Sequence, residues 1–212
     1  LLSTLPPVRG ISPRAGKDLM TQGACEVLDT RRYDAFGSLH IPKSWNIDGE
    51  MNFSTFTGWV IPPDRDILLA VHRPDEIPKI TLMLHRVGID RIIGYVEGGV
   101  WGWALAGHEL DRVQTISVQE LDALLKADKE LIVLDVRTGA EFAGYHIPGS
   151  VNIHWPDLRT RYSELSREKR IAVLCATGAR SSMACSILKR NDFSNILNVA
   201  GGYTGWVAGG FQ

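Results

Sequence analysis

The sequence predicts an α/β protein with two similar domains, each a mostly parallel sheet flanked by helices. Short apolar runs alternate with helical patterns, and the second half of the chain repeats the first. The 212 residues, of which 44% are hydrophobic and 22% charged, suffice for two small globular domains. Strands that are apolar at every position and separated by helices are typical of parallel sheets covered on both faces.

The internal repeat is direct. Residues 27–47 match residues 133–153 at 11 of 21 positions without a gap. The match resumes at residues 92–103 and 195–206, which share a pair of glycines and a tryptophan (Gly98/Gly201, Gly99/Gly202, Trp103/Trp206). A period of about 105 residues indicates a duplicated domain, because solenoid repeats are shorter. We therefore expect domains at residues 1–110 and 111–212, with residues 1–10 linker-like and the boundary within residues 107–115.

Each half is expected to open with a helix. Ser12 precedes Pro13 in the first half, and Ser117 with Glu120 forms a capping box in the second. Four short apolar runs are expected strands, at residues 26–29, 66–71, 131–136 and 170–175. An apolar stripe at helical spacing follows the second run (Ile80, Met83, Leu84, Val87) and the fourth (Met183, Ala184, Ile187, Leu188).

Composition excludes several classes of function. The 23 basic and 24 acidic residues leave a net charge of −1, and no basic stretch interleaved with aromatics suggests nucleic acid as a partner. No segment approaches the roughly 20 apolar residues that cross a bilayer, and the start lacks the apolar centre of a signal peptide. We expect no membrane partner and a cytoplasmic location. The odd number of cysteines, Cys25, Cys175 and Cys185, argues against a disulfide framework.

Cys175 is the candidate nucleophile. It ends the fourth apolar run, so its thiol is expected on a strand-to-helix turn, where ligands of open α/β sheets bind. The loop amides and the positive end of the helix dipole favour a thiolate there. The alternative is a thiol that merely packs, as buried cysteines usually do.

The residues after Cys175 suit an anion. Ala176, Thr177, Gly178 and Ala179 include no proline, so each main-chain N–H can donate a hydrogen bond, and Gly178 can adopt a positive φ. Arg180 adds a planar cation that can bind an oxyanion with two hydrogen bonds. The loop is therefore expected to hold an anionic substrate beside the sulfur.

An ordered set of residues then resembles the rhodanese family of sulfurtransferases. The set comprises Asp135-Val136-Arg137, Glu141-Phe142, His146-Ile147-Pro148-Gly149-Ser150, the C-x-x-G-x-R loop of Cys175, Gly178 and Arg180, then Gly201-Gly202 and Trp206. The resemblance covers residues 114–212.

The resemblance implies that Cys175 takes the outer sulfur of thiosulfate or of a persulfide donor. The Cys175 persulfide would then pass the sulfur to a thiol or to cyanide. It implies binding of the donor by residues 176–180 and no metal or organic cofactor. Its partners would be a small anionic sulfur donor and a thiol acceptor.

Three alternatives accompany this interpretation. The protein could be an accessory module that accepts persulfide sulfur for a neighbouring domain and turns over poorly alone. Phosphatases share the fold, but their loop has one more residue, and Leu174 stands where tyrosine phosphatases usually carry histidine. Residues 52–69 further resemble tandem rhodaneses that follow a metallo-β-lactamase-like domain, in some cases in persulfide dioxygenases, so such a domain is expected upstream.

The first half is expected to be a non-catalytic partner. Counting back 103 residues from the shared glycines places His72 opposite Cys175 and Ile77 opposite Arg180. Two prolines and two acidic residues in that loop (Pro74, Pro78, Asp75, Glu76) would disfavour an anion. In the second half we expect structural roles for Asp135, Arg137, Glu141 and His146, and a packing role for Cys185.

Overall fold

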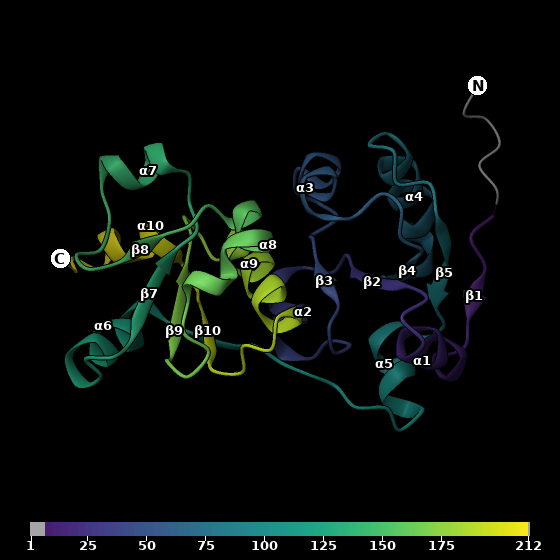
Figure 1. Cartoon of the computed structure of the whole chain (residues 1–212), viewed down its shortest axis with the longest axis horizontal. Coiled ribbons are helices and arrows are strands. Elements are labelled where there is room, and N and C mark those ends of the chain that lie inside the picture. The colour runs from purple at the N-terminus through teal and green to yellow at the C-terminus, as the bar shows by residue number, and fades with distance from the viewer. Residues whose placement is uncertain (1–6, 212) are drawn as a thin grey trace. The chain divides into compact units, whose positions relative to one another are not determined.

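The computed structural model describes residues 7–211 and separates into two compact units. The first comprises the described residues up to Ala35 together with Leu39–Asp111. The second comprises Phe36–Ser38 and the described residues from Arg112 onward. Each unit contains one five-stranded sheet, and most elements of both are labelled in Figure 1.

All strand pairs in the two sheets are parallel. The first sheet has the order β1-β5-β4-β2-β3, and the second has the matching order β6-β10-β9-β7-β8. The first-sheet strands are β1 Gly10–Ile11, β2 Glu26–Asp29, β3 Trp45–Asn46, β4 Ile67–Ala70 and β5 Ile92–Val96. The second-sheet strands are β6 Gln114–Ile116, β7 Ile132–Asp135, β8 Val151–Asn152, β9 Ile171–Leu174 and β10 Ile196–Val199.

Helices cover both faces of each sheet. The first unit contains α1 Pro13–Thr21, α3 Phe53–Val60, a 3₁₀ turn η1 Pro74–Glu76, α4 Ile77–His85 and α5 Gly99–Leu105. The helix α2 Tyr33–Ser38 begins in the first unit, and its last three residues are assigned to the second. The second unit contains α6 Val118–Ala127, α7 Gly139–Gly144, α8 Leu158–Arg161, α9 Ala179–Arg190 and α10 Gly202–Ala208, with 3₁₀ turns η2 Trp155–Asp157 and η3 Tyr162–Glu164. In the second unit α6 packs with α10, and α8 packs with α9.

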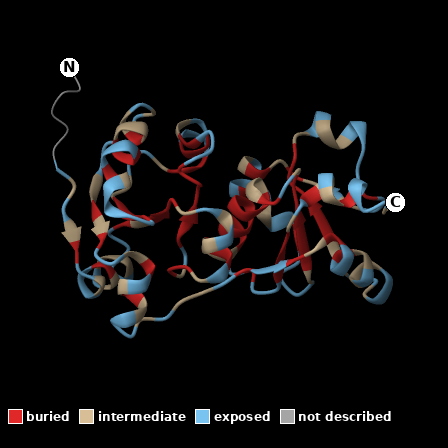
Figure 2. Ribbon diagram, turned by 180° about the vertical axis from the view of Figure 1, so that it is seen from behind, coloured by how far each residue is buried: buried red, intermediate tan, exposed pale blue. Residues whose placement is uncertain are grey.

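The central strands are the most buried parts of the fold. Every residue of β4 and of β9 is buried, as the red strands in Figure 2 show. One face of the second sheet contributes Val133, Ala172 and Val199 to a core closed by Leu121 of α6 and Trp206 of α10. Such continuous burial explains why these strands are apolar at every position.

The predicted α/β class is confirmed. All four predicted apolar runs contain a strand, and both predicted helix starts are observed. The Ser12 side chain accepts from the Ala15 amide at 3.3 Å, and Ser117 with Glu120 forms the complete capping box. In the first unit α4 ends at His85, so Val87 of the predicted stripe lies beyond the helix, and Thr81 takes a buried position instead.

The prediction that each half opens with a helix was wrong. β1 and β6 precede the first helices and pair with β5 and β10. These strands have two and three residues, which are too few for a periodic apolar pattern. They form because they pair with the longer strands β5 and β10. Residue 10 therefore lies in a strand and not in a linker, while residues 1–6 of the predicted linker lie outside the described residues. No helix in the described part of the chain has the length and apolar character needed to cross a bilayer.

Candidate active site

Cys175 lies directly after β9, the central strand of the second sheet, and before α9. Its side chain is buried, with 1% of the residue exposed. The rim of the loop reaches the surface, because Thr177 is exposed and Ala176, Ala179 and Arg180 are partly exposed. The carboxyl end of a central parallel strand is where open α/β sheets bind ligands, so the sulfur occupies the expected position.

Main-chain hydrogen bonds fix the direction of the loop amides. The carbonyl oxygens of Cys175, Ala176 and Thr177 accept from the amides of Tyr203, Thr204 and Gly201, at 2.7, 3.0 and 3.1 Å. No described peptide bond is cis, and in a trans peptide the N–H points away from the preceding C=O. The three following N–H groups, of residues 176–178, therefore point away from the start of α10.

The Gly178 amide, which points away from α10, contacts the sulfur. It donates to Cys175 Sγ with an N···S distance of 3.1 Å. In the described structure the N–H groups of Ala176, Thr177 and Ala179 have no acceptor. Free donors beside a sulfur atom can hold the negative charge of a thiolate, of a persulfide or of a bound anion.

Two glycines make this arrangement possible. Gly178 has φ +114°, a backbone conformation that side chains rarely adopt. Gly202 has φ +53°, and a Cβ at that position would overlap the carbonyl oxygen of Cys175. Glycine at position 202 therefore lets the start of α10 approach the loop closely enough to donate to its carbonyls.

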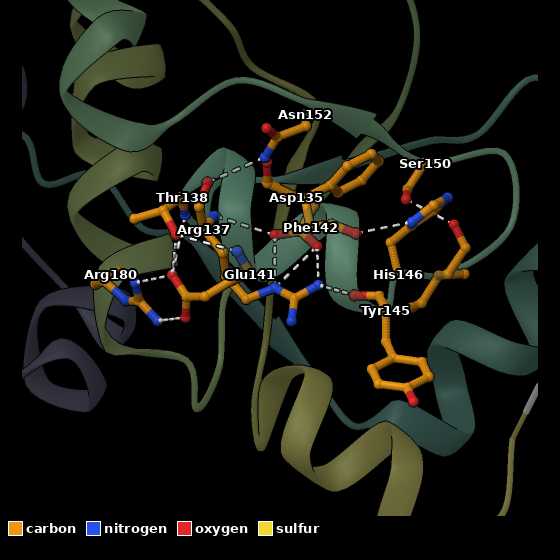
Figure 3. Close-up of polar contacts among 11 residues, drawn as sticks. Asp135, Arg137, Thr138, Glu141, Phe142, Tyr145, His146, Ser150, Asn152 and Arg180 are labelled. Carbon is orange, nitrogen blue, oxygen red and sulfur yellow. Dashed lines mark hydrogen bonds and ion pairs between the residues drawn. The ribbon is translucent and has the colours of Figure 1, made fainter.

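Arg180 is paired with Glu141 of α7 (Figure 3). Its Nη1 and Nη2 donate to the two carboxylate oxygens at 2.9 and 2.8 Å. Glu141 also completes a capping box with Thr138, whose amide and hydroxyl donate to Glu141 Oε2 at 3.0 and 2.9 Å. The pKa of Glu141 is lowered to about 2, and the hydrogen bonds from Arg180 are the largest cause. The same pair raises the pKa of Arg180. The cation beside the loop is thus already neutralised by a carboxylate.

A separate polar network joins the end of β7 to the end of α7 and to β8, as Figure 3 also shows. Arg137 Nη2 donates to Asp135 Oδ2 at 2.6 Å and to the carbonyl of Tyr145 at 2.8 Å. The Asn152 amide donates to the carbonyls of Asp135 and Arg137 at 2.8 and 3.0 Å. The Arg137 guanidinium also stacks 4.2 Å from the ring centre of Tyr203.

The first unit repeats this network without the cysteine. Arg31 Nη2 donates to Asp29 Oδ2 at 2.6 Å and to the carbonyl of Leu39 at 2.8 Å, and the Asn46 amide contacts the carbonyls of Asp29 and Arg31. A network present in both units belongs to the fold, which confirms the expected structural role of Asp135 and Arg137. Glu141 differs, because its counterpart in the aligned repeat is Ala35.

The predicted correspondence between the two loops was wrong by one residue. Asp29 pairs with Ala70, and Asp135 pairs with Leu174, so the residue opposite Cys175 is Val71 and not His72.

A β-bulge is the cause of this shift. The pairing of β4 with β5 moves from Ile67↔Ile92 to Leu68↔Gly94, which leaves Ile93 as one extra residue before the glycine pair. By the same register Glu76, and not Ile77, stands opposite Arg180.

With the corrected register, the first-unit loop differs from the Cys175 loop at more of the proposed site positions than the predicted alignment indicated. Val71 has no reactive atom, and Glu76 places a negative charge where the second unit has Arg180. Pro74 replaces Gly178 and has no amide proton. Within the described first unit, no amide of the turn at Gly98 and Gly99 donates to the carbonyls of residues 71–74. His72 is exposed.

The other two cysteines are buried away from the loop. Cys185 is fully buried in α9, and burial raises the pKa of its thiol. Burial also raises the pKa of Cys25 to about 11. Both pKa shifts disfavour the reactive thiolate, which agrees with the packing role predicted for Cys185.

His146 and His154 are the histidines of the second unit. His146 stacks on Phe142 with ring centres 4.1 Å apart, and its Nδ1 lies 3.0 Å from the Phe142 carbonyl. His154 is partly buried, and desolvation lowers its pKa.

Sequence comparisons identify relatives of the second unit. A model of the rhodanese-like domain matches residues 117–209. The putative sulfur carrier protein YrkF of Bacillus subtilis is 33% identical over 94 residues, which are 44% of this chain and 51% of that protein. A sulfurtransferase of Allochromatium vinosum is 30% identical over 98 residues, covering 46% of this chain and 92% of the relative. The putative sulfurtransferase YtwF of Bacillus subtilis is 33% identical over 94 residues, covering 44% of this chain and 90% of the relative.

Solved structures are also similar to the chain. A rhodanese-related protein of Thermoplasma volcanium has 34% identity and a TM-score of 0.43, with 47% of this chain and 95% of that chain covered. A thiosulfate sulfurtransferase of Pseudomonas aeruginosa has 23% identity and a TM-score of 0.43. That comparison covers 97% of this chain and 43% of the other.

Proposed function

Because this chain belongs to the rhodanese-like family, we propose that it is a sulfurtransferase that carries sulfane sulfur on Cys175. The observation that carries the proposal is the amide cradle. The Gly178 N–H donates to Sγ, and the N–H groups of Ala176, Thr177 and Ala179 in the same loop have no acceptor in the described structure. Relatives that are named sulfurtransferases support the general reaction class.

The proposed first half-reaction loads the cysteine. The Cys175 thiolate attacks the outer sulfur of thiosulfate, and a new S–S bond forms to Sγ. The bond between the outer sulfur and the sulfonate breaks, and its electron pair leaves with sulfite. The negative charge now rests on the outer sulfur of the Cys175 persulfide, where the N–H groups of residues 176–179 can stabilise it.

The proposed second half-reaction unloads it. An acceptor thiolate, or cyanide in an assay, attacks the outer sulfur and forms a new bond to it. The S–S bond of the persulfide breaks, and the Cys175 thiolate is regenerated with the released electron pair. The two steps make a ping-pong cycle, and Cys175 is the group that changes covalently in both.

The role of Arg180 in this cycle is electrostatic. Each of its two Nη atoms gives one N–H to Glu141, so the second N–H of each Nη, the Nε–H and the positive charge are what it can offer a donor anion. We propose that Arg180 binds the anionic end of the donor while Glu141 holds the guanidinium in place.

Mass spectrometry tests the proposal. The chain is incubated with thiosulfate, its intact mass is measured, and digestion locates the added sulfur. We expect one sulfur atom on Cys175 and none in a Cys175→Ser variant. Loading on Cys25 or Cys185 alone, or no loading with thiosulfate and with glutathione persulfide, would overturn the assignment.

Steady-state kinetics separate an enzyme from an accessory module. The burial of Cys175 favours the second candidate, because an acceptor must reach a residue that is 1% exposed. A thiosulfate:cyanide rate well above that of Cys175→Ser supports the enzyme. Stoichiometric loading with a rate equal to that of Cys175→Ser supports an accessory module that accepts persulfide sulfur for another domain, such as the metallo-β-lactamase-like domain expected upstream.

A further inference from the structure

The peptide that joins Gly178 to Ala179 is held by side chains as well as by α9, whose Ser182 amide donates to the Gly178 carbonyl at 3.3 Å. The three peptides before it are held by main-chain amides at the start of α10. The Asn198 amide Nδ2 donates to the Gly178 carbonyl at 3.2 Å. Ser181 Oγ lies 2.5 Å from Asn198 Oδ1 and 3.0 Å from the same Gly178 carbonyl. Ser181 is 0% exposed and Asn198 2% exposed, so both polar groups are buried.

The number of protons decides which side chain donates to the carbonyl beside the Ser182 amide. A serine hydroxyl has one proton, and the shorter contact to Asn198 Oδ1 takes it. The Asn198 amide is then oriented with Nδ2 toward Gly178, and it is the side-chain donor to that carbonyl. Ser181 acts through Asn198, because its hydrogen bond prevents the amide from turning over.

We propose that Asn198, oriented by Ser181, is a positioning residue that keeps the Cys175–Gly178 loop in its anion-binding form. The inference rests on the proposed function, because it takes Cys175 Sγ as the reacting atom. Holding the Gly178 carbonyl fixes the Ala179 N–H on the opposite side of the same peptide. It also fixes one of the two peptides that flank Gly178. The φ of +114° at Gly178, and with it the hydrogen bond to sulfur, depends on both flanking peptides being held.

The first unit shows that this pair accompanies the cysteine loop and is not required by the fold. The strand registers place Tyr95 opposite Asn198, Ile77 opposite Ser181 and Pro74 opposite Gly178. These three residues line a cavity of about 330 Å³ in the first unit. The same fold thus forms with none of the three polar contacts, whereas the Asp–Arg–Asn network is kept in both units. Burying a serine and an asparagine costs free energy unless their hydrogen bonds are made, so the pair is expected to serve the loop.

The test measures the reactivity of Cys175 without any sulfur transfer. The rate of Cys175 alkylation by iodoacetamide is followed from pH 5 to pH 10 by peptide mass spectrometry, in the wild type and in Asn198→Leu. We expect the midpoint of the profile to rise by about one pH unit, with a fall of about tenfold in the rate at neutral pH. A purely structural role would lower stability and leave the midpoint of the folded protein unchanged.

Asn191→Leu is the matched control. The Asn191 amide donates to the Ile187 carbonyl at 2.8 Å, near the far end of α9, so this variant removes a similar hydrogen bond from the same helix. We expect its alkylation profile to match the wild type. An equal shift in both variants, or no shift in a folded Asn198→Leu protein, would overturn the proposal.

Ser181→Ala keeps the proposal testable if Asn198→Leu fails to fold. We expect a smaller shift of the midpoint in the same direction, and a double variant that shifts no further than Asn198→Leu alone, because the two side chains act in series. A Ser181→Ala profile equal to wild type would contradict the role given to Ser181. A wild type with a normal alkylation profile that gains no sulfur from any donor would instead refute the proposed function.

Discussion

Replacing Glu141 by glutamine is expected to change how the stability of the second unit depends on pH. The Glu141 carboxylate accepts two hydrogen bonds from Arg180 and two from Thr138, and its pKa is lowered to about 2 from an ordinary value of 4.5. A group with a lowered pKa stabilises the folded state above its unfolded pKa, and this contribution is lost as the pH falls through the folded pKa. The pH window is therefore about 4.5 down to 2.

The magnitude follows from the shift and from the exposure of the pair. A change from 4.5 to about 2 corresponds to about 3 kcal/mol if it is expressed in full. The Glu141 side chain is 35% exposed and that of Arg180 21% exposed, so solvent screens the pair. We expect about 1–2 kcal/mol of unfolding free energy to be present at neutral pH and to disappear below pH 2.

Hydrogen exchange on peptides that cover β9 measures this contribution, since that strand is buried along its whole length. The opening free energy of Glu141→Gln is subtracted from that of the wild type at each pH between 2 and 6. The contributions of the other carboxylates cancel in this difference, because both proteins contain them. Glu120→Gln is the matched control, because Glu120 completes the Ser117 capping box and forms no ion pair in the described structure. A wild-type advantage that stays constant over this range, or that is equal for the two glutamates, would refute the reasoning.

Three further predictions concern the loop. Arg180→Ala is expected to raise the thiosulfate KM, by an amount that corresponds to about 1–3 kcal/mol of lost binding free energy. Adding Glu141→Gln is expected to recover part of that binding, because it removes the unpaired carboxylate, whereas an unchanged KM in Arg180→Ala would mean that the arginine is only structural. Cys185→Ala is expected to leave sulfur loading on Cys175 intact by mass spectrometry, and a loss of loading would show that Cys185 takes part. Val71→Cys is expected to gain no sulfur from thiosulfate, since Pro74 and Glu76 replace the amide donor and the cation; loading there would show that a cysteine at the end of the central strand suffices.

The sequence was informative wherever the signal is local. Continuous apolar runs identified β2, β4, β7 and β9, because a strand buried on both faces needs apolar residues on both. Ser117 and Glu120 lie within one helical turn, so their capping box could be predicted from spacing alone. The resemblance of the ordered residues from Asp135 to Trp206 to rhodaneses agrees with the family of the relatives.

Contacts between distant residues were not predictable in this way. Glu141 and Arg180 are 39 positions apart, and Asn198 and Gly178 are 20 apart. No pattern in either segment specifies the partner, because the sheet brings them together. Asn198 is one polar residue in an apolar strand, and that isolated polarity was the available signal for it.

What the sequence by itself determined is the α/β class, the duplication and the cysteine loop with its small, proline-free residues, since all three depend on residue types at short spacing or on direct identity. Only the tertiary structure decided the register of the two halves, in which the extra Ile93 in β5 puts Val71 opposite Cys175. It also decided which way the loop amides point, because the loop carbonyls are held by the start of α10 or, at Gly178, by Ser182 and Asn198. Strand pairing and peptide orientation are set by hydrogen bonds between segments far apart in the chain, and a linear pattern does not record them.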